Sequence, residues 1–397
     1  MKRTVRLKLH PTPEQATALC ETQTMVRYCF DTVAAYGWEQ GVKNGVALHK
    51  ATYYPLREKY PSVPAQLVCA ARVKATEALA SAFALKAKGL KVHCPRTKIG
   101  SIRYDARSHR ILPGEASLAS AVGRIKVAWT TNSHAAAILA KAVDFDSSDL
   151  LYRDGTWWLH AVLTLPDEPF SATGKAVGVD LGINRPAVTS GNEFLGEARW
   201  KEIEKRYFRL KRNLQAKGTA SAMRHLRRIR HRQQRFRRDC DHVLSRRIVD
   251  MAGNGSVIVL ENLKGIRSTT KQRGKRQRRR HHGWSYEQLK TFLEYKAEAA
   301  GCRVETVDPR KTSQRCSKCE YTARSNRKNQ SLFVCGACGF SLNADLNAAR
   351  NIAWKYLAQD GMPALGGPPV NRPIVTHVEA KASTGELRPS VVTSLVF

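Results

Sequence analysis

The chain has 397 residues, and its 67 Lys and Arg against 33 Asp and Glu give a formal net charge of +34. A charge of this size repels itself unless a polyanion neutralises it, and nucleic acid is the expected polyanion because phosphate contacts release counterions. The composition argues against a membrane-spanning protein, since no apolar run approaches the roughly 18 residues of a membrane helix. The length allows two or three domains. We therefore expect a soluble, cytoplasmic protein that binds nucleic acid.

The chain is predicted to begin with a strand followed by helices. Val5, Leu7 and Leu9 alternate with charged residues, a pattern typical of a half-buried strand. The run Thr12–Gln15 combines a capping Thr, a Pro at the first helical position and a Gln that closes a capping box. A helix is therefore predicted to begin there. A second helix is predicted after Pro64.

From about His93 the pattern changes to short strands and turns. Leu150–Leu159 predicts a hairpin around the turn Asp154-Gly155. The N-terminal part is thus predicted to be a small β-barrel or sheet with helices inserted after its first strand. A linker is expected over Pro166–Thr173.

Two apolar strands in the second half each end at an acid. Lys175–Gly182 carries Asp180, and Ser256–Asn262 carries Glu261. Acids commonly terminate strands, so neither residue is informative alone. Parallel or mixed α/β sheets, however, expose such groups together at their strand ends.

Residues 199–250, between these strands, are helical in pattern and rich in base. The basic residues recur at helical spacing and form a stripe suited to a phosphate backbone, with a solvated face as the alternative. The stripe consists of Arg224, Arg227, Arg228, Arg232 and Arg235.

The remaining segments are a basic loop, a helix, a strand and a tail. Lys271–His282 is too polar to pack, a helix is predicted from Tyr286, and Arg303–Val307 is a predicted strand. The tail from Asp360 lacks periodicity and is expected to be disordered.

Four cysteines have the spacing of a metal site. The pairs Cys316/Cys319 and Cys335/Cys338 are separated by fifteen residues, as in a four-thiolate zinc ribbon. The zinc either replaces the missing core of a small subdomain or positions chemistry, because Asp345 follows seven positions later at a predicted helix start. The other six cysteines show no spacing pattern, which fits a reducing compartment.

Strand-Asp180, strand-Glu261 and helix-Asp345 together are the ligands that a two-metal phosphodiesterase needs. Mg²⁺ prefers carboxylate oxygens on rigid elements, with positions left open for water and phosphate.

Five motifs, in this order, are similar to those of the TnpB family of transposon-encoded RNA-guided nucleases, which are related to compact type V CRISPR effectors. The resemblance runs from Met1 to about Leu357. The motifs are Gly178–Asn184, Val259–Leu263, Thr312–Cys319, Cys335–Gly339 and Asn343–Asn351.

The resemblance implies an α/β multidomain protein. Its parts are a RuvC-like nuclease domain with the RNase H fold and an inserted zinc ribbon, and an N-terminal wedge-type β-barrel with a helical recognition insertion. The implied boundaries are 1–10 and 90–166 for the barrel, 11–89 for the insertion, 174–307 and 342–359 for the RuvC-like domain, 308–341 for the ribbon and 360–397 for the tail.

The resemblance also implies an RNA-guided DNA endonuclease with one RuvC-like site, associated with a prokaryotic transposable element and with the nucleoid when active. Asp180, Glu261 and Asp345 fall on the family's catalytic acids, which bind two Mg²⁺ ions. The four cysteines fall on its zinc ligands. The implied partners are a guide RNA and double-stranded target DNA, with sequence read by base pairing. One departure is Glu320, where the first knuckle often carries Gly.

Other classes of protein explain parts of this pattern. A CRISPR-array-guided compact type V effector would carry the same motifs, because only neighbouring genomic DNA separates it from a transposon protein. A non-enzymatic nucleic-acid-binding module explains the charge and the cysteines but not the three acids. An actin-like ATPase shares the Gly178–Gly182 pattern but needs a second Gly-rich phosphate loop, which the sequence lacks.

Overall fold

The computed structural model describes residues 1–183, 185–263, 274 and 285–359. The predicted tail from Asp360 and, apart from Gly274, the basic loop at 271–282 lie outside the described residues.

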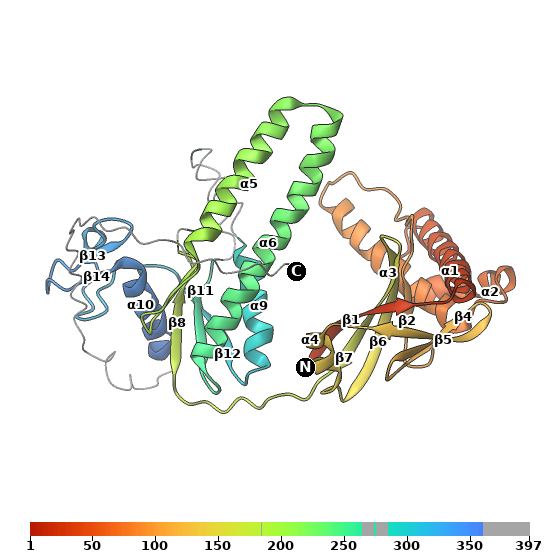
Figure 1. Ribbon diagram of the computed structural model, residues 1–397, viewed down its shortest axis with the longest axis horizontal. Helices are drawn as coiled ribbons and strands as arrows, with labels where there is room; N and C mark the ends of the chain where they lie inside the picture. The colour runs from red at the N-terminus through yellow and green to blue at the C-terminus, as the bar shows by residue number, and fades with distance from the viewer. Residues whose placement is uncertain (184, 264–273, 275–284, 360–397) are drawn as a thin grey trace, which may run out of the picture. The chain divides into compact units, whose positions relative to one another are not determined.

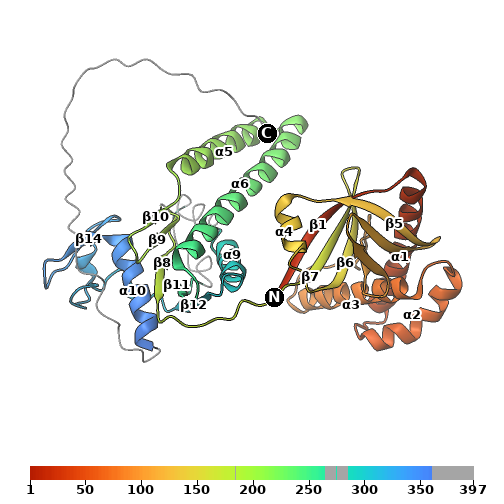
Figure 2. The ribbon, with the colours of Figure 1, turned by 60° about the horizontal axis from the view of Figure 1, so that its bottom comes forward.

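The chain divides into two compact units, which are described separately (Figures 1 and 2). One comprises Met1–Ser171 with Tyr295–Gly301, and the other comprises Ala172–Glu294 with Cys302–Phe397.

The first unit is built on a seven-stranded antiparallel sheet with the strand order β2-β6-β7-β1-β5-β4-β3. The sheet is nearly closed, because side chains connect its two ends. The Tyr104 hydroxyl of β2 donates to the Ala119 carbonyl of β4 at 3.1 Å, and Ser148 of β6 bonds His109 of β3 at 2.9 Å. The strands are β1 (Lys2–His10), β2 (Ile102–Tyr104), β3 (His109–Leu112), β4 (Glu115–Ser120), β5 (Gly123–Thr130), β6 (Asp144–Arg153) and β7 (Thr156–Thr164).

Local sequence signals place the elements of this unit. Val5, Leu7 and Leu9 are buried on one face of β1, which confirms the predicted strand. Thr12 and Gln15 form the predicted capping box. The β6–β7 hairpin turns at Asp154-Gly155, both at positive φ, as a tight hairpin turn requires. The helices are α1 (Pro13–Glu39), α2 (Gly45–Lys59), α3 (Ala65–Ala87) and α4 (Ser133–Leu139).

The second unit contains a five-stranded mixed sheet with the order β10-β9-β8-β11-β12. β8 (Ala176–Asp180), β11 (Val257–Glu261) and β12 (Arg303–Val307) are parallel neighbours, while β9 (Ala187–Thr189) and β10 (Phe194–Leu195) add antiparallel pairs. Figures 1 and 2 show α10 (Ala344–Gln359) on one side of this sheet, with α6 (Ala220–Ala252) and α9 (Tyr286–Glu298) on the other.

The stretch predicted to be one helical region forms two helices, α5 (Ala198–Lys217) and α6. Gly218 adopts a left-handed conformation that ends α5, and the Thr219 side chain caps α6. Leu214 of α5 packs against Leu226 and Ile229 of α6. The result is the antiparallel helical hairpin that projects from the sheet in Figure 1.

Candidate active site and cysteine cluster

Asp180 and Glu261 end neighbouring parallel strands. The register pairs Val179 of β8 with Leu260 of β11, so the next residue of each strand is an acid at the same edge of the sheet. The hydrophobic residues before both acids are buried and fix the strands in the core. The sheet therefore brings the two predicted carboxylates together.

A glycine allows the third acid to approach. An ideal Cβ on Gly178 of β8 would lie 2.1 Å from the Ala349 carbonyl oxygen and 2.5 Å from the Ala353 nitrogen of α10. Only a residue without a side chain lets the helix pack this closely on the strand. Asp345 lies in the first turn of α10, where its backbone N–H donates to the Asn343 side chain at 3.0 Å.

The three acids interact electrostatically. Burial raises the pKa of Asp180 to about 7, with smaller contributions from the negative charges of Glu261 and Asp345. Burial also raises the pKa of Glu261. Like charges gathered in a partly buried position cost free energy, which a bound divalent cation would offset. The donor set, three carboxylates, fits a hard cation such as Mg²⁺.

Two polar residues that sequence reasoning did not assign contact these acids. The Thr312 hydroxyl donates to Glu261 Oε1 at 2.5 Å, and Arg327 forms an ion pair with Asp345 at 3.2 Å. Thr312 lies inside a motif already singled out, next to the first knuckle, so its position was a usable signal. Arg327 follows a short 3₁₀ turn, η1 (Arg324–Asn326), and no sequence pattern marks it.

Two buried amides of α10 hold the segment that carries Thr312. The Asn351 side-chain amide donates to the carbonyl oxygens of Thr312 at 2.8 Å and Arg315 at 2.6 Å. The Asn347 amide donates to the Arg315 carbonyl oxygen at 2.8 Å and accepts from the Ser317 N–H at 3.0 Å. Because α10 also carries Asp345, this network connects the helix acid to the group that holds Glu261.

The four predicted cysteines converge on one point. Their Sγ atoms all lie within 4.8 Å of one another, and among the described residues this is the one group of three or more potential ligands gathered so closely. Cys316 and Cys338 are 3.8 Å apart, and Cys319 and Cys335 are 3.5 Å apart. A tetrahedral metal with metal–sulfur bonds of about 2.3 Å requires similar separations. The quartet can therefore hold a metal ion.

The two knuckles have the same backbone geometry despite their different residues. Glu320 and Gly339 both have φ of 68°, although only glycine adopts this conformation without strain. Arg315 forms an ion pair with the Glu320 carboxylate at 2.6 Å, which compensates part of that cost. The short strands β13 (Leu332–Val334) and β14 (Ser341–Asn343) pair beside the second knuckle and lead into α10.

The basic stripe lies on the solvent side of α6. The opposite side of the helix, with Leu226 and Ile229, faces α5. In the part of the chain that the structure describes, no stripe residue forms an ion pair within 4.0 Å. The exposed stripe residues are Arg224, Arg227, Arg228, Arg232 and Arg235.

No helix in the described ranges combines the length and apolar character that crossing a bilayer requires.

Solved structures define the class of this fold. The cryo-EM structure of a Cas12f1–sgRNA–target DNA complex is similar with a TM-score of 0.63, over 89% of this chain and 98% of that chain, at 14% sequence identity. The predicted multidomain α/β architecture is thus confirmed at the level of the fold.

Family models agree with this class. The model described as "Cas12f1-like, TNB domain" matches residues 286–352, and OrfB_IS605, described as "Probable transposase", matches residues 160–267.

Several curated proteins are similar over part of their length. Cas12f1, a CRISPR-associated endodeoxyribonuclease of Sulfoacidibacillus thermotolerans, is 32% identical over 54% of each chain. The "Putative RNA-guided DNA endonuclease InsQ" of Escherichia coli K12 is 33% identical over 46% of this chain and 50% of that protein. The TnpB-like protein aq_aa05 of Aquifex aeolicus is 33% identical over 30% of this chain and 38% of that protein. The chain spans about half the length of the first two relatives. The resemblance to the TnpB family is confirmed by these matches.

Proposed function

We propose that the protein is an RNA-guided DNA endonuclease associated with a transposable element, with a guide RNA and double-stranded target DNA as its partners. The observation that carries this proposal is the gathering of Asp180, Glu261 and Asp345 at one edge of the second unit's sheet. The similarity to InsQ and Cas12f1, whose names describe such activity, supports it.

The second unit is proposed to be a RuvC-like domain with the RNase H fold, over residues 174–307 and 342–359. The strand order β10-β9-β8-β11-β12, with three parallel and two antiparallel members, supports this assignment. The cysteine quartet is proposed to bind Zn²⁺ in a ribbon over residues 308–341. In the first unit, residues 1–10 and 90–166 would form the wedge-type barrel and 11–89 its recognition insertion.

The proposed chemistry is hydrolysis of a phosphodiester bond at a two-metal site. Bound Mg²⁺ would supply an activated water and stabilise the leaving oxygen. Asp180, Glu261 and Asp345 would hold the cations, and the negative charges of the other two acids raise the pKa of Asp180. Thr312 fixes the orientation of one Glu261 oxygen, and Arg327 neutralises Asp345 while no cation is bound.

The test is guided cleavage by Asp180→Ala, using protein purified with its RNA and a matched DNA target. Cleavage should fall below detection. Binding of RNA and of target DNA should stay near wild type, because the acids contribute little to contacts with the phosphate backbone of the nucleic acid. Asp239→Ala, which removes an exposed acid of α6, is the matched control and should cleave normally. Cleavage by Asp180→Ala at the wild-type rate would place the active site elsewhere.

A further inference from the structure

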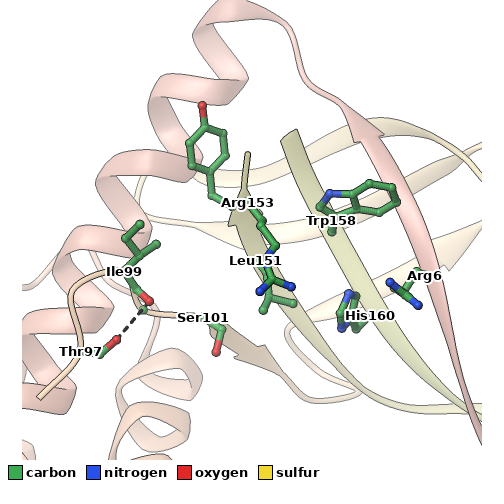
Figure 3. Close-up of a pocket in the computed structure, with 10 residues that line it drawn as sticks. Arg6, Thr97, Ile99, Ser101, Leu151, Arg153, Trp158 and His160 are labelled. Atoms are coloured by element: carbon green, nitrogen blue, oxygen red, sulfur yellow. Dashed lines mark hydrogen bonds between the residues drawn. The ribbon is translucent and has the colours of Figure 1, made fainter. Parts of the chain in front are cut away.

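The first unit contains a pocket of about 360 Å³ that the proposed active site does not use. It lies on the outer face of the sheet, over β1, β7 and β6, beside the loop at residues 97–101 (Figure 3). The strand register places Arg6 directly beside His160, and Trp158 directly beside Leu151. Neighbouring strands therefore present these side chains on the same face.

Three basic side chains meet in this pocket. Arg6, Arg153 and His160 all line it, and Figure 3 shows them around a common space. In the described ranges neither guanidinium has a carboxylate within 4.0 Å. Burial lowers the pKa of His160, and the positive charges of Arg6 and Arg153 lower it further, against the opposing charge of Asp149. The pocket therefore favours an anion.

Asp149, the acid whose charge acts on His160, is already paired with other cations. Asp149 lies beside His160 in the strand register, but its carboxylate is 2.6 Å from the Lys74 ammonium and 3.8 Å from Arg103. The field in the pocket stays positive as a result.

Apolar and aromatic groups accompany the cations. Trp158 is half-buried in the pocket, and Tyr152 and Ile99 line it while remaining 40% and 65% exposed. A purely solvated basic surface has no need of such groups. Aromatic side chains next to cations are the combination that binds an unpaired base together with its phosphate. The volume lies at the lower end of the about 300–1,000 Å³ typical of small-molecule sites, which suits one nucleotide and excludes a stacked duplex.

We propose that this pocket binds one unpaired nucleotide of single-stranded RNA, with its base against Trp158 and its phosphate between Arg6 and Arg153. The inference rests on the proposed function, which supplies the RNA partner. RNA is favoured over DNA because loops and ends of a guide RNA offer unpaired bases whether or not a target is bound, whereas target DNA is single-stranded only after the guide has opened it.

The test measures binding of a short labelled oligouridylate to the full chain, freed of bound nucleic acid at high salt. Trp158→Leu should weaken binding about tenfold, since base–aromatic stacking contributes roughly that much. Trp158→Phe keeps an aromatic ring and should stay within about threefold of wild type. Arg6→Gln with Arg153→Gln should reduce the slope of the logarithm of the binding constant against the logarithm of salt concentration. The expected reduction corresponds to about one to two phosphate contacts.

Arg110→Gln removes an exposed charge of β3 that does not line the pocket, and is the matched control for charge. In wild-type protein, RNA containing 4-thiouridine should crosslink to the peptide of β7 or to residues 97–101, a readout that needs no variant to fold. Wild-type affinity in Trp158→Leu, or crosslinks confined to other peptides, would overturn the proposal. An equal effect on the matched deoxyuridylate oligonucleotide would overturn the assignment to RNA. Guided cleavage measured alongside separates the two proposals, because its dependence on Asp180 does not involve this pocket.

Discussion

Asp180 concentrates the electrostatic cost of the candidate active site. Asp180 is the last residue of a buried strand, and the negative charges of two further acids act on its carboxyl group. The sequence motifs single out these acids and the four cysteines, because strand ends and CxxC spacing are local patterns, and the structure brings the members of each set together. Thr312 and Arg327 could not be assigned in the same way, since their roles depend on contacts with residues 51 and 18 positions away.

The raised pKa of Asp180 makes the stability of the metal-free protein depend on pH. In the folded chain the Asp180 carboxyl keeps its proton up to about pH 7, whereas in the unfolded chain it releases the proton at about pH 3.9. The contribution of this carboxyl group to the free energy of unfolding is therefore fully present below the pKa of the unfolded chain. It is lost as the pH rises through the pKa of the folded chain. In chelator, Asp180→Asn should raise Tm by several degrees at about pH 8, with a gain that shrinks toward about pH 4. Thermal unfolding across this range is the measurement, and parallel curves for the two proteins would contradict it.

Thr312 is expected to act by holding Glu261. Thr312→Val removes the hydroxyl at nearly constant shape, and losing a hydrogen bond to a charged group costs about 1.5–3 kcal/mol. Guided cleavage should fall roughly tenfold or more, with a higher Mg²⁺ concentration needed for half-maximal rate. Thr312→Ser retains the donor and should restore most of the activity. Normal cleavage by Thr312→Val together with a loss in Thr312→Ser would show that packing of the methyl group and not the hydrogen bond is what matters.

At the scale of elements, one close contact between β8 and α10 assembles the candidate active site. Gly178 admits the helix, and the Asn347 and Asn351 amides fasten it to the segment before the first knuckle. The sequence predicted β1, β8, β11 and β12, the capping box and the Asp154-Gly155 hairpin, since each has a local signature. It did not separate α2 as a helix, because Gly45 at its start and Pro55 inside it oppose helix formation locally, and burial of Leu48 and Leu56 in the core overrides that preference.

Gly178→Ala should push β8 and α10 apart. The added Cβ meets backbone atoms that cannot move aside independently, and such overpacking costs about 1–3 kcal/mol or more. A lower Tm and a severe loss of cleavage are expected. Gly191→Ala is the matched control, since its nearest neighbour would lie 3.7 Å away. Equal behaviour of the two variants in thermal unfolding would show that α10 can shift without cost.

At the scale of the whole molecule, the excess of 34 positive charges favours the nucleic-acid partners proposed above. Part of this charge lies on the exposed side of α6 and part around the pocket on the first unit's sheet. Composition predicted the kind of partner. It did not predict the pocket, because Arg6, Arg153 and His160 come together only when three strands pair.

The stripe on α6 should contribute affinity without sequence preference. Arg227→Ala with Arg228→Ala is expected to weaken binding of unrelated nucleic acids alike and to reduce the salt slope by up to about two phosphate contacts. Binding isotherms at several salt concentrations measure this, with Arg110→Ala as the control. An unchanged slope would show that these residues form an ordinary solvated helix face and do not contact phosphates.

The bonds from Tyr104 to Ala119 and from Ser148 to His109 have a consequence for how the protein behaves at high concentration. An open β-sheet presents edge strands whose free backbone groups can recruit another chain and begin aggregation. Here the two ends of the sheet cover each other, so neither edge is a free template. Tyr104→Phe, which removes one of these bonds, should therefore reveal itself first as slow self-association on storage and only later as lost activity.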